Sequence, residues 1–224
     1  LDLQICYNMA IAEEGLKNNY GANIGKTILK YGCSIIDKMK AFAASGSDAR
    51  MNGCEMPVVI NSGSGNQGIT ASMPVLAYAQ EYNIDEDRLY RALVVSNLTA
   101  IHQKTTIGRL SAYCGAISAG CASACGVAYL LGEDLETISQ TLSNSLAITS
   151  GVICDGAKAS CAAKIATAVD SGLMGYYMCK NKKNFCSGDG IVGDGIEKTI
   201  KNVGKLASQG MRETDKVIIE IMTE

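Results

Sequence analysis

The chain has 224 residues, a formal net charge of −2 and a pI near 5.5. This length supports one sizeable hydrophobic core, so we expect one domain over residues 1–224, and the charge balance argues against a nucleic-acid partner. Apolar residues make up 47% of the chain, but no charge-free run is long enough to span a membrane, so no membrane segment is expected.

The composition predicts an all-α fold, because proline occurs only twice, alanine, leucine and methionine are frequent, and alternating strand patterns are scarce. The segments 51–68, 151–160 and 181–195 are expected to be irregular. Residues 217–222 fit a short strand or a helical turn, and helix is favoured. The expected helices cover residues 1–17, 23–44, 66–82, 85 to about 101, 105–131 with at most one break, 134–148, 161–179 and 196–207.

A segment rich in glycine and serine directly precedes the helix expected from residue 66. Glycine allows a ligand to approach the backbone, and a helix N-terminus offers free amides and the positive end of its dipole. A small anion such as a carboxylate suits this arrangement, although an ordinary capping loop has the same pattern. The candidate ligand-binding residues are Ser62, Gly63, Ser64, Gly65 and Asn66.

Ten cysteines in a long, core-rich chain indicate free thiols in a reducing cytoplasm rather than a disulfide scaffold. Cys154 and Cys161 flank a turn that also carries Lys158, which favours thiolates and soft-metal binding. The alternative is a pair of buried cysteines beside a solvated lysine. Either way, the chain contains no C-x2-C pair, so any metal site must be assembled from distant segments.

Cys114, Cys121 and Cys125 fall in one predicted helix. Cys114 and Cys121 would be about 10 Å apart along the helix axis, which is long for two ligands of one cluster. Cys121 and Cys125 are one turn apart, which fits either a shared metal or two small core residues. The residues alone leave these alternatives open.

His102 is the only histidine, and it invites an acid–base assignment, although a capping or core histidine is the commoner case. Lys104 and Arg109 are close to it in sequence and could together hold a carboxylate, or could simply be solvated.

Four ordered motifs resemble the L-cysteine desulfidase family, which is related to the alpha chain of iron–sulfur L-serine dehydratases. They are Asn-Gly-Cys-Glu-Met-Pro at 52–57, the segment 61–68, Ile-Gly-Arg-Leu-Ser-Ala-Tyr-Cys-Gly-Ala at 107–116 and the turn 151–161. The resemblance runs from about residue 46 to the C-terminus. It implies a mainly helical domain that holds a [4Fe-4S] cluster through three cysteines and leaves one iron open.

The resemblance selects Cys114, Cys154 and Cys161 as the cluster ligands, although the spacing of the later pair is shorter than in the dehydratases. The remaining cysteines are then expected to have core, supporting or structural roles. The implied reaction removes sulfide from L-cysteine, or water from L-serine, and yields pyruvate and ammonia without pyridoxal phosphate. His102 or Lys158 is the expected base, and the glycine/serine segment is expected to hold the substrate carboxylate.

Family members are longer, so the chain is expected to be the C-terminal part of a longer protein that lacks an N-terminal region here. We therefore expect a homo-oligomer, a partner chain, or both, to complete the site. Two other functions stay open: an inactive helical binding subunit, and a thiol or zinc protein that uses Cys121, Cys125, Cys154 and Cys161.

Overall fold

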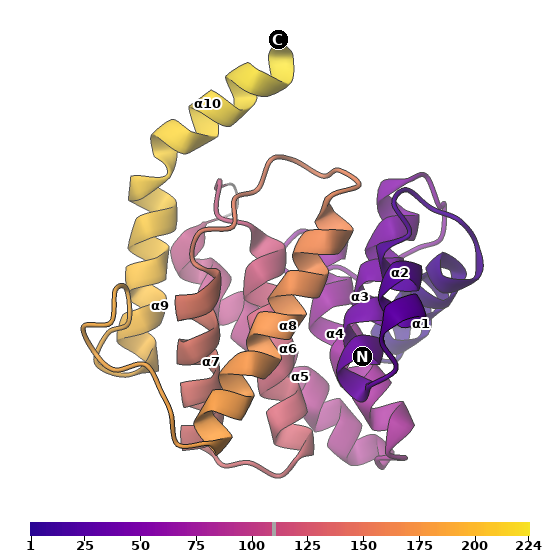
Figure 1. The fold of residues 1–224 in the computed structure, drawn as a ribbon, viewed down its shortest axis with the longest axis horizontal. Helices are drawn as coiled ribbons and strands as arrows, with labels where there is room; N and C mark the ends of the chain where they lie inside the picture. Colours follow the sequence, from indigo (N-terminus) through magenta and orange to yellow (C-terminus); the bar gives the residue numbers. More distant parts are fainter. Residues whose placement is uncertain (109–110) are drawn as a thin grey trace.

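The computed structural model describes residues 1–108 and 111–224. Within them no β-strand forms, apart from two isolated bridges, which confirms the all-α prediction (Figure 1). The helices pack into one compact domain. The elements are α1 (Asp2–Lys17), α2 (Ile24–Tyr31), α3 (Ile35–Met51), α4 (Gly65–Glu81), α5 (Glu86–Ile107), α6 (Gly115–Leu130), α7 (Leu135–Thr149), α8 (Cys161–Lys180), α9 (Ile196–Lys205), the π-helical turn η1 (Leu206–Gly210) and α10 (Arg212–Thr223).

Helix α6 forms the centre of the domain, with α4, α5, α7 and α8 packed around it. Nearly all of its residues are buried, and most are glycine, alanine, serine or cysteine. These small side chains allow close helix approach: a Cβ added to Gly120 would lie 2.5 Å from the Cβ of Ala168 on α8. The start of α6, which carries Cys114 as its N-cap, is therefore held firmly inside the domain.

The single helix predicted over residues 23–44 is wrong, because the chain forms α2 and α3 with a break between them. Ser34 caps α3 by accepting a hydrogen bond from the Asp37 backbone amide, and Asp37 accepts one from the Ser34 backbone amide. This capping box starts a new helix in a new direction. Helix α3 then continues to Met51, beyond the predicted end at residue 44.

The prediction of a helix over residues 105–131 is also wrong in its first part. Helix α5 extends to Ile107 and ends at Gly108, whose φ of 92° is accessible mainly to glycine. Helix α6 begins only at Gly115. Between these two helices, residues 112–114 form backbone hydrogen bonds with residues 152–154, which follow α7, and do not continue the helix.

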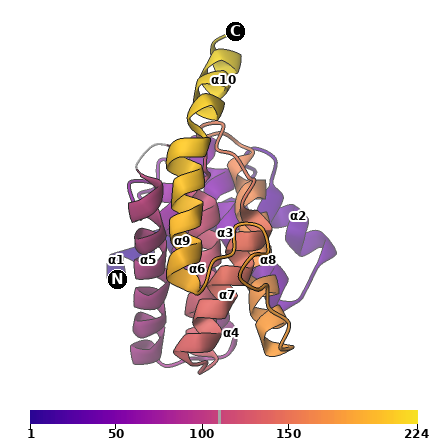
Figure 2. The same ribbon diagram turned by 90° about the vertical axis from the view of Figure 1, so that its left-hand side faces the viewer.

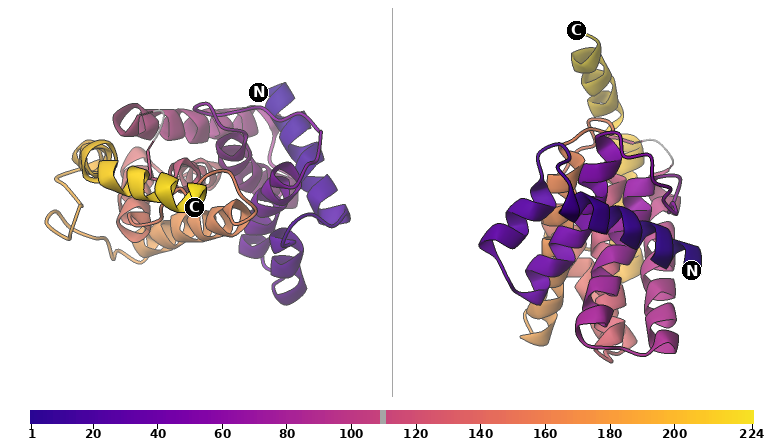
Figure 3. Two further views of the ribbon diagram at one scale, coloured as in Figure 1. Left: turned by 90° about the horizontal axis from the view of Figure 1, so that it is seen from above. Right: turned by 90° about the vertical axis from the view of Figure 1, so that its right-hand side faces the viewer.

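The C-terminal helices lie along one side of the domain. Helix α9 packs against α5 and α7, whereas α10 has no buried residue and projects from the body (Figures 1 and 2). From above, α10 extends across the domain from α9 toward α8 (Figure 3). Its end approaches the 151–160 segment, since a Cβ on Gly156 would lie 3.1 Å from the Cε of Met222. The helix predicted over residues 217–222 is confirmed.

No helix in the described residues combines the length and apolar character needed to cross a membrane.

Candidate functional site

Two short extended segments, forty residues apart in sequence, meet at the start of α6. The Cys154 backbone amide donates to the carbonyl of Ala112 at 2.6 Å, and the Cys114 amide donates to the carbonyl of Val152 at 3.4 Å. An isolated bridge between Tyr113 and Ile153 lies between these bonds. The pairing brings together the Cys114 and Cys154 thiols, two of the three predicted metal ligands.

The two thiols differ in their protonation. As a hydrogen-bond donor, Cys114 lowers the pKa of Cys154 to about 6, against an opposing effect of burial. The same interaction, together with burial, raises the pKa of Cys114. Backbone amides of Ala116 and Ile117, in the first turn of α6, also point to the Cys114 sulfur and favour its thiolate. Cys154 is therefore the thiol of the pair that ionises more readily, and the thiolate is the ligand form for soft metals.

Two lysines add positive charge to the thiol pair. Lys104 on α5 lies near both sulfurs, and burial lowers its pKa while the thiolates oppose that change. Lys164 on α8 donates to the carbonyl of Ile153 at 3.1 Å, forms an ion pair with Asp155, and lowers the pKa of Cys154. The sequence suggests that Lys104 could hold a carboxylate together with Arg109, and Arg109 lies outside the described residues. Lys104 itself lies beside the two cysteines.

Cys161, the third predicted ligand, is the first residue of α8, on the same connecting segment as Cys154. Its thiol donates to the carbonyl of Gly156 at 3.6 Å. Within residues 1–108 and 111–224, no three histidine, cysteine or acidic side chains gather closely enough to hold a metal ion. The structure thus brings two of the three predicted ligands together and leaves Cys161 at the adjacent helix start.

The glycine/serine segment forms a tight turn followed by a capped helix. Asn61 and Ser64 exchange backbone hydrogen bonds of 3.1 and 3.0 Å across Ser62 and Gly63, which have φ values of 50° and 83°. Ser64 caps α4 by accepting a bond from the Gln67 amide. Gly65 and Asn66 form the buried first turn of α4. The turn therefore leads directly into a helix N-terminus, as the sequence predicts.

Two residues near this turn escaped the sequence analysis. Arg50, at the end of α3, donates to the side-chain oxygen of Asn66 at 3.2 Å and lies against Gly65. Gln67 is buried, and its side-chain amide lies against Gly115, the residue that follows Cys114. Their contacts connect residues that are distant in sequence, so no local pattern identifies them. Gln67 places the start of α4 next to the start of α6.

The two candidate bases occupy different parts of the domain. The His102 Nε2 atom lies 3.0 Å from the Glu197 carboxylate on α9, and both residues line a cavity of about 270 Å³ between α5, α7 and α9. Lys158 is exposed on the 151–160 segment. The hydrogen bond with Lys164 is the main cause that lowers the pKa of Asp155, and Lys158 makes only a small contribution. Neither His102 nor Lys158 is among the residues that shift the pKa values of the thiol pair.

Cys121 and Cys125 are fully buried in α6. The Cys121 sulfur lies 3.5 Å from the Thr149 hydroxyl, and burial raises its pKa to about 12. Cys125 contacts the carbonyl of Ile138 at 3.8 Å, and burial raises its pKa as well. Both side chains are fully buried in the helix core, which fits the core role that the resemblance gives them. Cys6, Cys33 and Cys186 are exposed, and Cys179 is half-buried.

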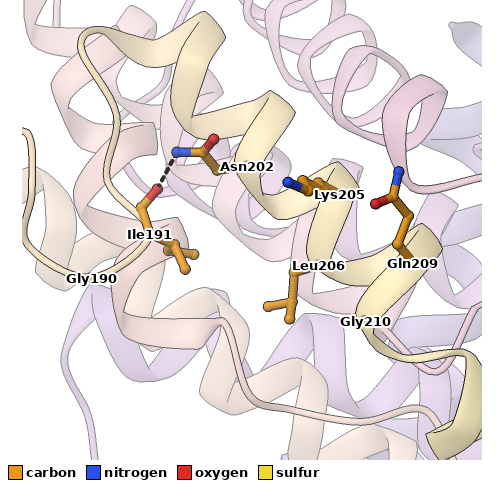
Figure 4. A pocket seen from close by; sticks show the side chains of 7 residues that line it. All are labelled: Gly190, Ile191, Asn202, Lys205, Leu206, Gln209 and Gly210. Carbon is orange, nitrogen blue, oxygen red and sulfur yellow. Dashed lines mark hydrogen bonds between the residues drawn. The ribbon is translucent and has the colours of Figure 1, made fainter.

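A cavity of about 580 Å³ lies between the loop before α9 and the turn of η1 (Figure 4). Asn202 donates to the carbonyl of Ile191 at its edge, and Lys205 and Gln209 contribute polar groups. None of the predicted site residues lines this cavity, so it is separate from the cysteine pair.

Comparison with known proteins now identifies the family. The profile of the serine dehydratase alpha chain matches residues 2–220. A UPF0597 protein of Desulfitobacterium hafniense (strain Y51) is 60% identical over 223 residues, which cover 99% of this chain and 52% of that protein. UPF0597 proteins of Lachnoclostridium phytofermentans and Finegoldia magna are 55% and 53% identical, over 99% and 100% of this chain and 54% of each relative. The chain thus spans about half the length of these relatives, and it belongs to the serine dehydratase alpha-chain family.

Proposed function

We propose that this chain is the cluster-binding part of an iron–sulfur lyase that eliminates sulfide from L-cysteine, or water from L-serine, to give pyruvate and ammonia. The observation that carries the proposal is the meeting of Cys114 and Cys154 at the start of α6, beside Lys104 and Lys164. Membership of the serine dehydratase alpha-chain family supports a lyase. The desulfidase-like motifs favour cysteine as the substrate.

The residues fit a [4Fe-4S] cluster in the chemistry of their donors. Such clusters are held by cysteine thiolates, and Cys114 and Cys154 are adjacent. The hydrogen bond from Cys114, with a smaller contribution from Lys164, lowers the pKa of Cys154, and the amides at the start of α6 oppose part of the rise in the pKa of Cys114. Cys161 is the proposed third ligand, because it starts α8 on the same segment as Cys154. When bound, a cluster with one iron free of protein ligands supplies a Lewis acid for the β-thiol or hydroxyl of the substrate.

The chain's own residues would bind and orient the amino acid. The N-terminus of α4, with Ser62, Gly63, Ser64, Gly65 and Asn66, is the proposed carboxylate site, and Arg50 adds a guanidinium group there. Lys104 balances the negative charge of the thiolates. His102, held by Glu197, or Lys158 is proposed to take the Cα proton. No pyridoxal phosphate is required in this scheme.

Other parts of the assembly are also proposed to contribute. The chain covers about half of its curated relatives, and an alpha chain is compatible with a beta-chain partner. We infer that a further region, a partner chain or a second copy completes the substrate site. The ten free thiols agree with a reducing, cytoplasmic location.

The test is anaerobic reconstitution with iron and sulfide, followed by assays of metal, acid-labile sulfide and pyruvate. We expect about four irons and four sulfides per chain, as in a cubane cluster, and pyruvate from L-cysteine or L-serine. Cys114→Ser, Cys154→Ser and Cys161→Ser should each lower the iron content. Cys33→Ser is the matched control, because this thiol is exposed on the segment before α3 and should not affect iron binding.

Three results would contradict the proposal in different ways. A folded anaerobic chain that takes up no iron would exclude the cluster. Zinc binding that depends on Cys154 and Cys161 would identify a thiol or zinc protein. A folded chain that is loaded with iron and binds the amino acid but forms no pyruvate, even when the region or partner chain that completes the site is supplied, would identify an inactive binding subunit.

A further inference from the structure

Helix α10 exposes a cluster of large apolar side chains. Those of Val217, Ile219, Ile221 and Met222 are 50%, 62%, 65% and 49% exposed, and no residue of the helix is buried. Elsewhere in the described residues, no stretch of six positions exposes more than two large apolar side chains. Extended apolar patches are rare on monomeric proteins and mark interaction sites. A partner that covers α10 would therefore remove unfavourable apolar surface from water.

The domain itself contacts α10 along one side only. Ile218 packs against the hydrophobic core, and Met222 lies against Gly156, with 3.1 Å between the Met222 Cε and an added Cβ. Val217 and Ile221 are four residues apart, so they share a face, and that face stays open. Figure 2 shows the helix projecting from the body. A helix of 12 residues is marginal in water on its own, so a partner would also stabilise it.

The charges of α10 favour a protein partner over a membrane surface. Helices that lie on membranes carry mainly lysine and arginine on their polar face. The polar residues of α10 include three acidic side chains, Glu213, Asp215 and Glu220, against two basic ones, Arg212 and Lys216. An apolar face with a polar rim of mixed charge is typical of a protein interface.

The longer relatives contain a specific candidate for this partner. This chain covers 52% of the Desulfitobacterium hafniense protein and 54% of the Finegoldia magna protein, so a region of similar size accompanies the matched half in each. A region of this size is large enough for a domain, and thus for a surface that covers α10. Because it belongs to the same polypeptide, it is held at a high effective concentration, which favours it over a second copy.

The position of α10 relates this partner to the cysteine pair. Seen from above, α10 extends across the domain from α9 toward α8 (Figure 3). Gly156, which contacts Met222, is two residues after Cys154, and Ile153 on the same segment is 38% exposed. A region bound to α10 would therefore lie beside the segment that carries Cys154.

We propose that the open apolar face of α10 docks the region of the longer protein that lies outside this chain. Val217 and Ile221 are the contact residues. The docked region lies beside Cys154, where it completes the substrate site. This last statement rests on the proposed function and deepens it, whereas the docking itself requires no cluster.

The experiment uses a full-length chimera in which this chain replaces the 223 matched residues of the Desulfitobacterium hafniense protein, to which it is 60% identical. Hydrogen–deuterium exchange followed by mass spectrometry compares α10 in the chimera with α10 in the isolated chain. The amides of α10 should exchange quickly in the isolated chain and at least about tenfold more slowly in the chimera, because packing opposes local opening. The amides of α6 should be protected in both proteins, since this helix is buried in the domain.

A double substitution tests the two contact residues. A protease site between this chain and the remainder allows the chimera to be cut, and ultracentrifugation then measures the affinity of the two parts. Val217→Lys combined with Ile221→Lys should weaken this affinity at least about tenfold, because it places charge in an apolar contact. Lysine suits the end of a helix, so α10 itself is not weakened.

Met174→Lys is the matched control for the double substitution. Met174 is 52% exposed on α8, which makes no contact with α10, so the affinity of the two parts should not change. Circular dichroism and thermal melting check that each variant is folded.

The outcomes separate this inference from the proposed lyase. The inference is overturned if α10 exchanges equally fast in the chimera and the isolated chain, or if the folded double variant keeps its affinity. Slow exchange in the isolated chain that depends on its concentration would identify a second copy as the partner and overturn it too. Docking through α10 in a chimera that takes up no iron would overturn the lyase and leave the docking standing. Pyruvate formation without protection of α10 would do the reverse.

Discussion

The side-chain amide of Asn61 donates hydrogen bonds to both oxygens of Asn97: 2.9 Å to the side-chain oxygen and 3.2 Å to the backbone carbonyl. Asn97 in turn exchanges two side-chain bonds with Gln4 on α1, at 3.0 and 2.8 Å. This chain of amides ties the turn before α4 to α1 and α5. The proposed carboxylate site is therefore held by three segments that are far apart in sequence.

Asn97→Leu should lower the free energy of unfolding by about 2 kcal/mol, because it leaves the buried Gln4 amide without its two partners and Asn61 with only the backbone carbonyl at position 97. Urea denaturation measures the change. Asn19→Leu is the matched control, since Asn19 accepts a bond only from exposed Lys26. An Asn97→Leu variant as stable as this control would show that the amide chain is not needed for stability.

Gly68 is required by the close approach of the preceding segment to α4. A Cβ at this position would lie 1.9 Å from the carbonyl oxygen of Val59, which is far inside van der Waals contact. Gly68→Ala should therefore destabilise the domain by about 2–4 kcal/mol through overpacking against the backbone. Gly151→Ala is the control, because an added Cβ meets no atom within 4 Å there. Equal melting temperatures for the two variants would show that the backbone of Val59 does not pack closely against Gly68.

Cys154 should be the most readily ionised thiol of the buried pair when no metal is bound. Hydrogen bonding from Cys114 lowers the pKa of Cys154 to about 6, and the positive charge of Lys164 also lowers this pKa. Alkylation by iodoacetamide at Cys154 should thus increase with pH around 6, whereas Cys121, with a pKa near 12, should stay unmodified at neutral pH.

Lys164→Met should raise the pKa of Cys154 and move its alkylation profile to higher pH. Peptide mapping by mass spectrometry follows each cysteine. Lys180→Met is the control lysine variant, because Lys180 pairs with Glu133 at the far end of α8 and should leave the profile unchanged. If Cys154 is alkylated with the same pH profile in Lys164→Met and in the unmodified chain, Lys164 does not affect the ionisation of Cys154.

Asp48 should give the domain a measurable dependence on pH. Burial raises its pKa, against hydrogen bonds from the backbone amides of Gly25 and Ile24. Since the folded pKa exceeds the unfolded value of about 3.9, the stabilising contribution is complete below that value and is lost as pH rises through the folded pKa. Asp48→Asn should therefore lose stability relative to the unmodified chain as the pH falls from 7 to 4.

Asp87 is the control for this measurement, because the opposite slope is expected there. A hydrogen bond from Arg91 lowers its pKa, so its contribution is present above the unfolded pKa and is lost in acid. Urea titrations at several pH values give the free energy of unfolding for Asp48→Asn, Asp87→Asn and the unmodified chain. A pH-independent difference for Asp48→Asn would contradict the effect of burial.

The predicted helices mostly exist where local signals specify them. Asp85 and Asp134 cap α5 and α7, each accepting a bond from the backbone amide three residues later. The glycine/serine turn before α4 was also predicted. The helices predicted over residues 23–44 and 105–131 were too long, because Ser34 and Gly108 interrupt apolar stretches that continue on both sides. Hydrophobic pattern alone does not reveal such a break.

The sequence by itself determined the all-α class and the helix starts with capping residues, and through the resemblance it predicted Cys114, Cys154 and Cys161 as cluster ligands. Only the tertiary structure decided that Cys114 and Cys154 meet, that Arg50 contacts Asn66 and Gln67 lies against Gly115, and that His102 lies with Glu197. The physical reason is the range of the forces involved. Caps and turns depend on residues three or four positions apart, whereas these contacts depend on how closely whole helices pack around α6.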